Sequence, residues 1–360
     1  MDDPHLIDSA LDRNAPSGPP RMADVARIAG VSKMTVSRVL AGRSVALATR
    51  DRVQQAIDTL GYVSDAAAGA LSSGRSEFAA VLVPSLLSSN FSDTVRGLAA
   101  TLESAGLQLL LGNTEYDLQR EERLVRSMLR HQPRCIALTG AEHTDATRTL
   151  LQRSGIPVVE MWDLPTKPID TAVGFSNVKA AREMVRYLVG RGYRKIGFLG
   201  GASDLDRRGL ERLKGYLQEI KAQALGDPRV VRLGASPITM SHGGPAVSAL
   251  LDTWPDTDAV MCVSDMSAFG AIMQCQRRGL HVPGDIAVAG FGNFELAAYS
   301  NPTLTTVSVD AHGIGVHAGE VLLTALGENQ GAPPTQPSAS ARRASKHVKI
   351  DYHVIARESA

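Results

Sequence analysis

Short apolar runs alternate with amphipathic segments along most of the chain after Phe78. In the segments between the runs, apolar residues recur at helical spacing, as Leu98 and Leu102 do. Strands and helices in strict succession indicate a doubly wound α/β fold with parallel sheets. The predicted strands are AAVLVP, LQLLLGN, CIALTG, PVVEMW, KIGFLG, RVVRLG, AVMCVS and DIAVAGF.

The core that follows residue 76 is predicted to form two lobes. About nine strands over roughly 250 residues are too many for one sheet-centred core. TTVSVD and HVKIDYHVI, late in the chain, are expected to complete the sheets, and a Pro/Ser/Ala-rich loop separates them. Within 77–360 we expect a first lobe at about 78–173 and 292–326, and a second at about 174–291 and 347–360.

A different pattern precedes this core. Residues 1–20 are polar and end in Pro and Gly, which predicts a disordered tail. Residues 63–76 are rich in Ala, Gly and Ser and indicate a hinge with weak helical potential. Between them, residues 21–62 form a small all-α domain, with helices predicted from Met22, from Ser32 to about Leu40, and from Ala48 to Leu60 with Gly61 as its C-cap.

The segment MADVARIAGVSKMTVSRVLA has the spacing of a helix-turn-helix. Gly30 falls at the turn, where a left-handed backbone suits glycine, and Ser32 is placed to cap the second helix. Val36 would hold that helix on the first one. In this motif the N-terminal part of the second helix enters the major groove of DNA. The alternative is an amphipathic helical hairpin whose charges are only solvated.

The polar face of this second helix is therefore expected to contact double-stranded DNA. Lys33 and Met34 come first and are predicted to contact bases, since lysine donates to guanine acceptors and methionine packs on a thymine methyl. Phosphate contacts position such a module without specifying sequence. The residues predicted to make them are Ser32, Thr35, Ser37 and Arg38.

The charge distribution supports a nucleic-acid partner for this part of the chain. The formal net charge of the whole chain is only +1. Between Arg21 and Ser76, however, eight basic residues face four acidic ones, which leaves +4 there and −3 elsewhere. Such asymmetry is typical of a DNA-binding module joined to a neutral body.

Composition places the chain among cytoplasmic globular proteins without a membrane partner. The N-terminal residues lack the apolar region of a signal peptide, and no apolar run approaches transmembrane length. Cys135, Cys262 and Cys275 lie far apart, which predicts reduced core cysteines and no disulfide framework or zinc site.

The main competing classes, an enzyme and an exported binding protein, are less favoured. No phosphate-binding, metalloprotease or nucleophile-elbow motif occurs, and GFLGGASD lacks dinucleotide-binding spacing. His312 and His317 are five residues apart and do not form a helical metal pair. We therefore expect no catalytic residue, cofactor or metal. An exported binding protein would need a signal peptide.

DVARIAGVSKMTVSRVL, TRDRVQQAIDTLGYV and AAAGALSSGRS resemble the N-terminus of the lac/galactose-repressor (LacI/GalR) family. The resemblance covers nearly everything after residue 21. It implies a headpiece joined by a hinge helix to a two-lobed α/β core like a periplasmic binding protein, acting as a homodimer or tetramer. It also implies that the hinge helix inserts Leu71 into the minor groove of operator DNA. The alternative is that Leu71 packs on the core.

The chain departs from the family pattern at two places. The family usually has Pro-Asn before the hinge helix, and this chain has Ser64-Asp65. The family usually has Ser at the start of the third helix, and this chain has Ala46, which removes a capping hydroxyl. Both changes concern the folding of the hinge and the cap, and neither affects the helix-turn-helix.

An effector is expected in the cleft between the lobes, near the carboxyl ends of the strands. By resemblance, Asp265 and Arg212 match the family's ligand-binding aspartate and arginine, and Phe91 matches its aromatic residue. The alternatives are a helix N-cap for Asp265 and core packing for Trp162. The loops at these strand ends supply Ser85, Asn90, Phe91, Trp162, Asp163, Asp206, Arg207, Arg212, Asp265 and Asn293.

Within the family, PVVEMWDLPTKPIDTAVGFSN most resembles repressors of gluconate catabolism. The resemblance implies that Arg212, with Arg207, binds the carboxylate of a sugar acid. Related aldonates, ketogluconates and phosphorylated intermediates remain possible effectors, as does the sugar or nucleoside of another catabolic pathway. The hydroxyl groups would contact Asp265, Asp206 and Asn293.

Overall fold

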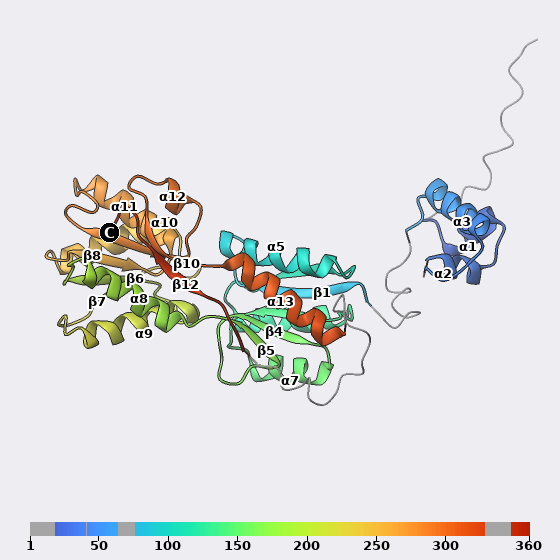
Figure 1. Cartoon of the computed structure of the whole chain (residues 1–360), viewed down its shortest axis with the longest axis horizontal. Coiled ribbons are helices and arrows are strands. Elements are labelled where there is room, and N and C mark those ends of the chain that lie inside the picture. Colours follow the sequence, from blue (N-terminus) through green and yellow to red (C-terminus); the bar gives the residue numbers. More distant parts are fainter. Residues whose placement is uncertain (1–18, 41, 64–75, 328–346) are drawn as a thin grey trace, which may run out of the picture. The chain divides into compact units, whose positions relative to one another are not determined.

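The chain forms two compact units, Met1–Glu77 and Phe78–Ala360, which we call the headpiece and the core (Figure 1). The structure is a computed structural model. Among the residues it describes, no helix is both long and apolar enough to cross a membrane. The described residues are 19–40, 42–63, 76–327 and 347–360.

Helices α1, α2 and α3 surround the apolar core of the headpiece. Gly30 and Gly61 end α1 and α3 with φ of 64° and 59°, a left-handed conformation that glycine adopts without strain. The helices span Met22–Ala29, Lys33–Leu40 and Leu47–Leu60, and the buried residues between them are Val25, Ala26, Ala29, Val36, Val53 and Ala56. The predicted all-α unit is confirmed.

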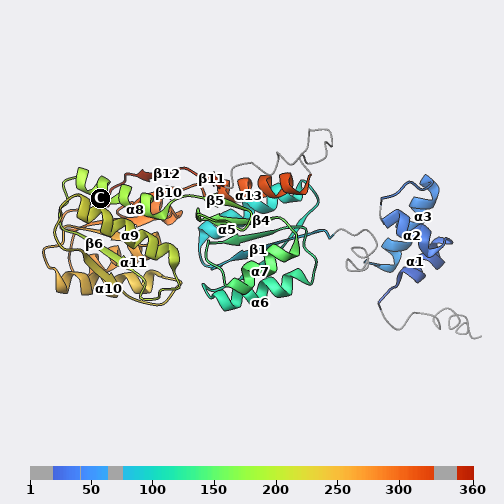
Figure 2. The same cartoon turned by 90° about the horizontal axis from the view of Figure 1, so that it is seen from below.

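The first lobe of the core is a parallel sheet with helices on both faces. Helices α5 and α13 lie side by side on one face and α6 and α7 cover the other (Figures 1 and 2). The sheet order is β11-β5-β4-β3-β1-β2. The elements are β1 (Phe78–Val83), α5 (Ser89–Glu103), β2 (Gln108–Asn113), α6 (Leu118–Leu129), β3 (Ile136–Thr139), α7 (Asp145–Ser154), β4 (Val158–Trp162), β5 (Thr171–Gly174), α13 (Ala311–Leu326) and β11 (His347–Lys349).

The second lobe repeats this arrangement with sheet order β12-β10-β9-β8-β6-β7. Its strands are parallel except β12, which runs antiparallel to β10. Helices α8 and α9 pack on one face, and α10 and α11 pack on the other. The elements are α8 (Asn177–Gly190), β6 (Ile196–Gly200), α9 (Arg207–Ala222), β7 (Arg229–Arg232), α10 (Met240–Thr253), β8 (Ala259–Cys262), α11 (Asp265–Arg277), β9 (Ala287–Phe291), α12 (Leu296–Tyr299), β10 (Thr305–Val309) and β12 (Tyr352–Ile355).

The late part of the chain is divided between the lobes differently from our expectation. Strand β10, expected in the first lobe within 292–326, pairs with β9 of the second sheet, with Thr305 opposite Ala289. Strand β11, expected in the second lobe within 347–360, pairs with β5 of the first sheet. An apolar run shows that a strand is buried, but its sheet is decided by the neighbours with which it forms hydrogen bonds. The chain therefore crosses between the lobes after β5, β10 and β11.

Three predictions concern parts of the chain that the structure describes only in part. Residues 1–18 of the predicted tail and 64–75 of the predicted hinge, with Leu71 and Ser64-Asp65, lie outside the described residues. The loop between α13 and β11 is also outside them. Cys135, Cys262 and Cys275 are buried, as expected of core cysteines, and their reduced state stays a prediction.

Candidate functional site

The N-terminal end of α2 presents the side chains predicted to contact bases. Ser32 precedes the helix, and its Oγ accepts a hydrogen bond from the Thr35 backbone N–H at 3.1 Å, so Ser32 caps the helix. Lys33 is exposed, and 74% of Met34 is accessible to solvent. Because Val36 is fully buried, the helix is anchored while Lys33 and Met34 stay accessible for contact. Base contact by Lys33 and Met34 stays a prediction.

The predicted phosphate-contacting residues follow along the same helix. Thr35 and Ser37 are half-buried and Arg38 is exposed. The Arg38 Nη2 donates a hydrogen bond to the Ser44 carbonyl at 3.4 Å, so the guanidinium lies along the loop after α2. The N-cap residue of α3 is Ala46, whose side chain cannot accept a capping hydrogen bond. A cap of this kind contributes about 1 kcal/mol, so α3 starts without that contribution.

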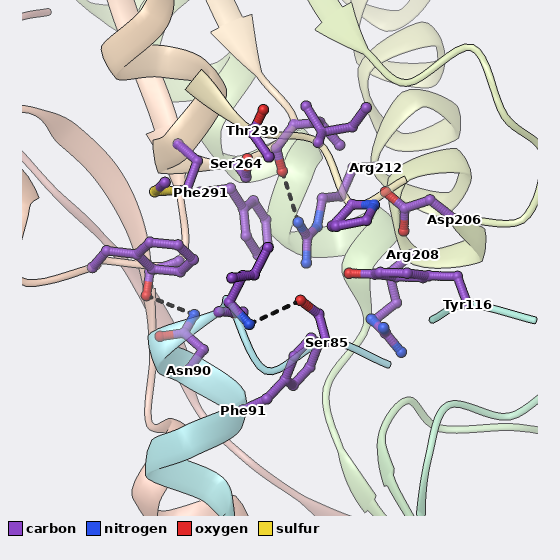
Figure 3. A pocket seen from close by; sticks show the side chains of 18 of the residues that line it. Ser85, Asn90, Phe91, Tyr116, Asp206, Arg208, Arg212, Thr239, Ser264 and Phe291 are labelled. Carbon is purple, nitrogen blue, oxygen red and sulfur yellow. Dashed lines mark hydrogen bonds between the residues drawn. The ribbon is translucent and has the colours of Figure 1, made fainter. Parts of the chain in front are cut away.

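The core contains a cavity of about 100 Å³ between its two lobes, at the carboxyl ends of the strands (Figure 3). Aromatic, cationic and hydroxyl-bearing side chains face one another across it. Its lining comprises Ser85, Leu87, Ser88, Asn90, Phe91, Tyr116 and Trp162 from the first lobe, and Asp206, Arg208, Arg212, Pro237, Ile238, Thr239, Val263, Ser264, Met266, Phe291, Gly292 and Phe294 from the second. We call this the first cavity.

Arg212 is a half-buried cation of the first cavity. Its Nε donates to Asn177 Oδ1 at 2.9 Å and its Nη1 donates to the Val263 carbonyl at 2.7 Å. The guanidinium stacks on the Phe291 ring, 3.7 Å from the ring centroid. No carboxylate of the described residues lies within 4 Å of it. Burial lowers the pKa of Arg212 to about 10, so it is still charged at neutral pH.

Arg208 is a second arginine of the same cavity. It is buried, and our sequence-based prediction missed it. Its guanidinium lies 5.3 Å from the Phe91 ring centroid and 6.0 Å from that of Tyr116. Its Nη1 is 3.7 Å from Asp163 Oδ2. Burial opposes the charge, but Asp163 and Tyr116 outweigh it and raise the pKa of Arg208. Residues 208 and 212 are one helical turn apart, and this spacing was the available signal.

Two predicted effector-binding residues, Asp163 and Arg207, lie beside the first cavity and not in its lining. Asp163 Oδ1 accepts a hydrogen bond from Asn177 Nδ2 at 3.0 Å, and burial raises the pKa of this carboxyl. Arg207 is exposed and forms an ion pair with Glu142 of the first lobe. Because α9 turns by about 100° per residue, Arg207 points away from the face that carries Arg208 and Arg212.

Asp265 does not line the first cavity, which corrects our prediction of a direct effector contact. Its carboxylate accepts hydrogen bonds from Thr306 Oγ1 at 2.6 Å and from the Phe294 backbone N–H at 2.7 Å. The side chain is completely buried, and burial raises its pKa to about 6. Ser264, one residue earlier, lines the cavity and caps α11. Asp265 therefore supports the loop after β9.

Asn293 also differs from our prediction. It has a φ of 52°, and its Nδ2 donates to Ser308 Oγ at 3.2 Å. Its Oδ1 accepts a hydrogen bond from Arg357 Nη2 at 2.8 Å. The left-handed backbone turns the side chain away from the first cavity and toward the strands that connect the lobes.

Three other predicted residues do line the first cavity. Phe91 and Trp162 make an edge-to-face contact with ring centroids 5.4 Å apart, and Trp162 Nε1 donates to Thr94 Oγ1 at 3.1 Å. Trp162 thus packs in the core and lines the cavity. Asp206 lines it as the N-cap of α9, accepting from the Gly209 N–H at 3.0 Å. Ser85 and Asn90, which we expected the strand-end loops to supply, also line the cavity. Lining residues that the sequence analysis did not name include Tyr116, Thr239 and Ser264.

Comparisons with known proteins agree with this architecture. Residues 21–65 match the family described as "Bacterial regulatory proteins, lacI family", and residues 185–359 match "Periplasmic binding protein-like domain". The chain is 38% identical over 311 residues to the HTH-type transcriptional regulator GntR of Pseudomonas aeruginosa, which covers 86% of this chain and 90% of that protein.

Two further relatives extend the comparison. The HTH-type transcriptional regulator GntR of Escherichia coli K12 is 35% identical over 85% of this chain and 92% of its own length. A crystal structure of a LacI-family transcriptional regulator from Silicibacter pomeroyi superposes with a TM-score of 0.85 at 33% identity, covering 95% of this chain and 99% of that one. These similarities include both the headpiece and the core. The chain therefore belongs to the LacI family of bacterial transcriptional regulators.

Proposed function

We propose that this chain is a cytoplasmic, homodimeric transcriptional repressor whose affinity for operator DNA is changed by gluconate or a closely related sugar acid. Arg212 is the observation that carries the choice of ligand. It is a half-buried cation in the first cavity, held by two hydrogen bonds and without a carboxylate within 4 Å among the described residues. A ligand in this cavity removes water from the Arg212 charge, and the carboxylate of that ligand would supply a counter-ion.

The remainder of the first cavity suits the hydroxylated carbon chain of such an acid. Hydroxyl and amide groups of Ser85, Asn90, Thr239 and Ser264 line it beside aromatic walls. A nucleoside or a neutral sugar would cover Arg212 without bringing a carboxylate to pair with it. Because Arg208 already faces Asp163, the arrangement favours one negative charge on the ligand over the additional charges of a phosphorylated acid. The similarity to two proteins named GntR points to the same subgroup.

The headpiece would bind operator DNA in the way predicted from its sequence. Lys33 and Met34 contact bases, while Ser32, Thr35, Ser37 and Arg38 contact phosphates. Leu71, outside the described residues, would enter the minor groove from the hinge helix. Effector binding between the lobes changes the angle between them and loosens the hinge. By linkage, operator must weaken effector binding by the same factor as effector weakens operator binding. No enzymatic step is part of this function.

Fluorescence anisotropy of a pseudo-palindromic operator, taken from DNA near the gene, tests this proposal. The full-length protein is titrated with gluconate or with D-glucitol, which has a hydroxymethyl group in place of the carboxylate. We expect gluconate to release the operator and D-glucitol to leave it bound. Release by both ligands, or by neither, would contradict the role given to Arg212. Equal effector affinity with and without operator would contradict the coupling.

A further inference from the structure

Helix α6 carries a row of arginines on the outside of the first lobe. The helix packs on the sheet beside α7 through Val125 and Met128, and the other side of the helix is accessible to solvent (Figure 2). Because an α-helix completes a turn in 3.6 residues, side chains three or four residues apart share a face. The arginines that share the outer face, which we call the arginine stripe, are Arg120, Arg123, Arg126 and Arg130.

The surroundings neutralise only part of the arginine stripe. Arg120 and Arg126 form ion pairs of 2.7 Å and 3.0 Å with glutamates. Arg123 and Arg130 are exposed, and neither has a carboxylate within 4 Å among the described residues. Glu121 is buried on the side of the helix that faces the sheet. The outer face of α6 therefore has a net positive charge.

The stability of α6 does not account for this row of like charges. Cations three or four residues apart on a helix repel one another. The helix dipole favours cations in the last turn, where Arg126 lies, but it disfavours them in the first turn, where Arg120 lies. No lysine occurs between Leu118 and Arg134, and the planar fork of arginine is suited to phosphate groups. The stripe is thus better explained by a partner that carries phosphates.

The spacing of the arginine stripe favours an extended polyanion over a small anion. The helix rises 1.5 Å per residue, so the stripe is about 15 Å long with one cation about every 5 Å. One strand of a DNA duplex carries a phosphate every 3.4 Å along its axis, whereas a single phosphate ion spans only one or two of these side chains. None of the four arginines lines the first cavity or the larger cavity, of about 260 Å³, that adjoins it.

The C-terminal end of the stripe lies where the chain enters the core from the headpiece. Arg134, in the loop after α6, donates its backbone N–H to the carbonyl of Phe78 at 2.7 Å, and Phe78 is the first residue of the core. The chain from Val63, the last described residue of the headpiece, to Phe78 spans at most about 50 Å. This connection keeps the effective concentration of headpiece-bound DNA near the stripe high.

We propose that the arginine stripe of α6 is a second DNA-binding surface, which contacts the phosphate backbone of duplex DNA outside the sequence that the headpiece reads. Such contacts do not depend on base sequence, so they increase the affinity for an operator within longer DNA without changing which operator is preferred. The inference rests on operator binding by the headpiece, and it does not depend on the identity of the effector.

Fluorescence anisotropy of the full-length protein with two duplexes tests this surface. One duplex contains only the operator, and the other adds about 20 base pairs on each side, which is about two helical turns. We expect the longer duplex to bind about three- to tenfold more tightly at about 0.1 M salt. The double variant Arg123→Gln/Arg130→Gln should lose this preference and should bind the shorter duplex like the wild type.

Arg191→Gln/Lys221→Gln is the matched control. Both residues are exposed in the second lobe, so the change removes the same amount of charge away from the stripe. This variant should keep the preference for the longer duplex. Arg123→Lys/Arg130→Lys keeps the charge of the stripe and should keep most of the preference. Thermal melting shows whether each variant is folded.

Equal affinity of the wild type for the two duplexes would overturn the proposal and would indicate an acidic protein as the partner of the stripe. A preference that survives in Arg123→Gln/Arg130→Gln would overturn it as well, because the additional contact would lie elsewhere. An equal loss in Arg191→Gln/Lys221→Gln would assign the preference to overall charge. The shorter duplex measures the headpiece alone and gluconate is absent throughout, so this inference and the proposed function can fail separately.

Discussion

The headpiece and the core hold their predicted ligand-binding cations in opposite environments. Lys33 and Arg38 are exposed on α2, whereas in the core Arg208 is buried and Arg212 is half-buried. An exposed cation acts on a polyanion through a screened, additive and salt-dependent attraction. A cation that the bound ligand shields from water gives a large difference in affinity between ligands that bring a counter-ion and ligands that do not. We therefore expect graded effects from changes in the headpiece and large, selective effects from changes in the cavity.

The largest effect is expected from Arg212→Gln. Removing one partner of a buried, hydrogen-bonded charge pair costs about 2–5 kcal/mol, so gluconate affinity should fall by about 30-fold or more. Operator affinity without effector should be unchanged, because Arg212 lies in the core and not in the headpiece. Isothermal titration calorimetry measures the first quantity and anisotropy measures the second.

Arg212→Lys is the matched control for this change. Lysine keeps the charge but loses the planar group that donates to Asn177 and Val263 and stacks on Phe291. Its gluconate affinity should lie between those of the wild type and Arg212→Gln. If Arg212→Gln responded to gluconate like the wild type, the carboxylate of the effector would have to bind elsewhere.

Asp265→Asn tests whether Asp265 is structural, as its burial indicates. Its pKa is raised from 3.8 to about 6, so the folded state binds this proton more tightly than the unfolded state does. The carboxyl therefore stabilises the fold most at low pH, and that contribution is lost as pH rises from about 4 to about 6. Two pKa units correspond to about 3 kcal/mol as an upper bound.

The measurement is denaturant unfolding of the wild type and Asp265→Asn at several pH values. The free energy of unfolding of the wild type relative to the variant should decrease between about pH 4 and pH 7, by at most about 3 kcal/mol. A difference that did not change with pH would contradict the raised pKa. The variant should weaken gluconate binding much less than Arg212→Gln does, because Asp265 does not line the first cavity.

The sequence was informative where a local pattern determines a local structure. Gly30 and Ser32 each have a role that depends on near neighbours, and the structure places them at the turn and at the cap. The first cavity depends on which loops of the two lobes meet. Asp265 and Arg208 show the difference. The Asp265 carboxylate is held inside the protein by Thr306, which is 41 residues away in the sequence. Arg208 faces Asp163, which belongs to the other lobe. The periodicity of the sequence does not specify contacts between residues that are distant along the chain. For the same reason we assigned β10 and β11 to the wrong lobes.

Gly30→Ala should have an intermediate effect that is confined to the headpiece. Gly30 has a φ of 64°, and no atom lies within 4 Å of an added Cβ, so the cost comes from the backbone and not from a clash. We expect about 1–2 kcal/mol of destabilisation. Scanning calorimetry and operator anisotropy measure it, and gluconate binding should be unaffected. Gly190→Ala in α8 is the control, since it also has open space around it but an ordinary φ. Equal destabilisation by both variants would exclude the left-handed turn as the cause.

The smallest effect is expected from Arg38→Ala. We expect it mainly in the salt dependence of operator affinity. Each phosphate contact contributes about 0.9 to the slope of log affinity against log salt, so loss of Arg38 should reduce that slope by about 1 and weaken all operator sequences alike. Lys33→Ala should instead reduce the preference of the protein among operator variants at one base pair. Anisotropy titrations at several salt concentrations, with the operator and with single-base variants, separate the two. An unchanged slope for Arg38→Ala would mean that its hydrogen bond to Ser44 keeps the guanidinium on the protein when DNA is bound, which would make Arg38 a residue that orders the loop after α2.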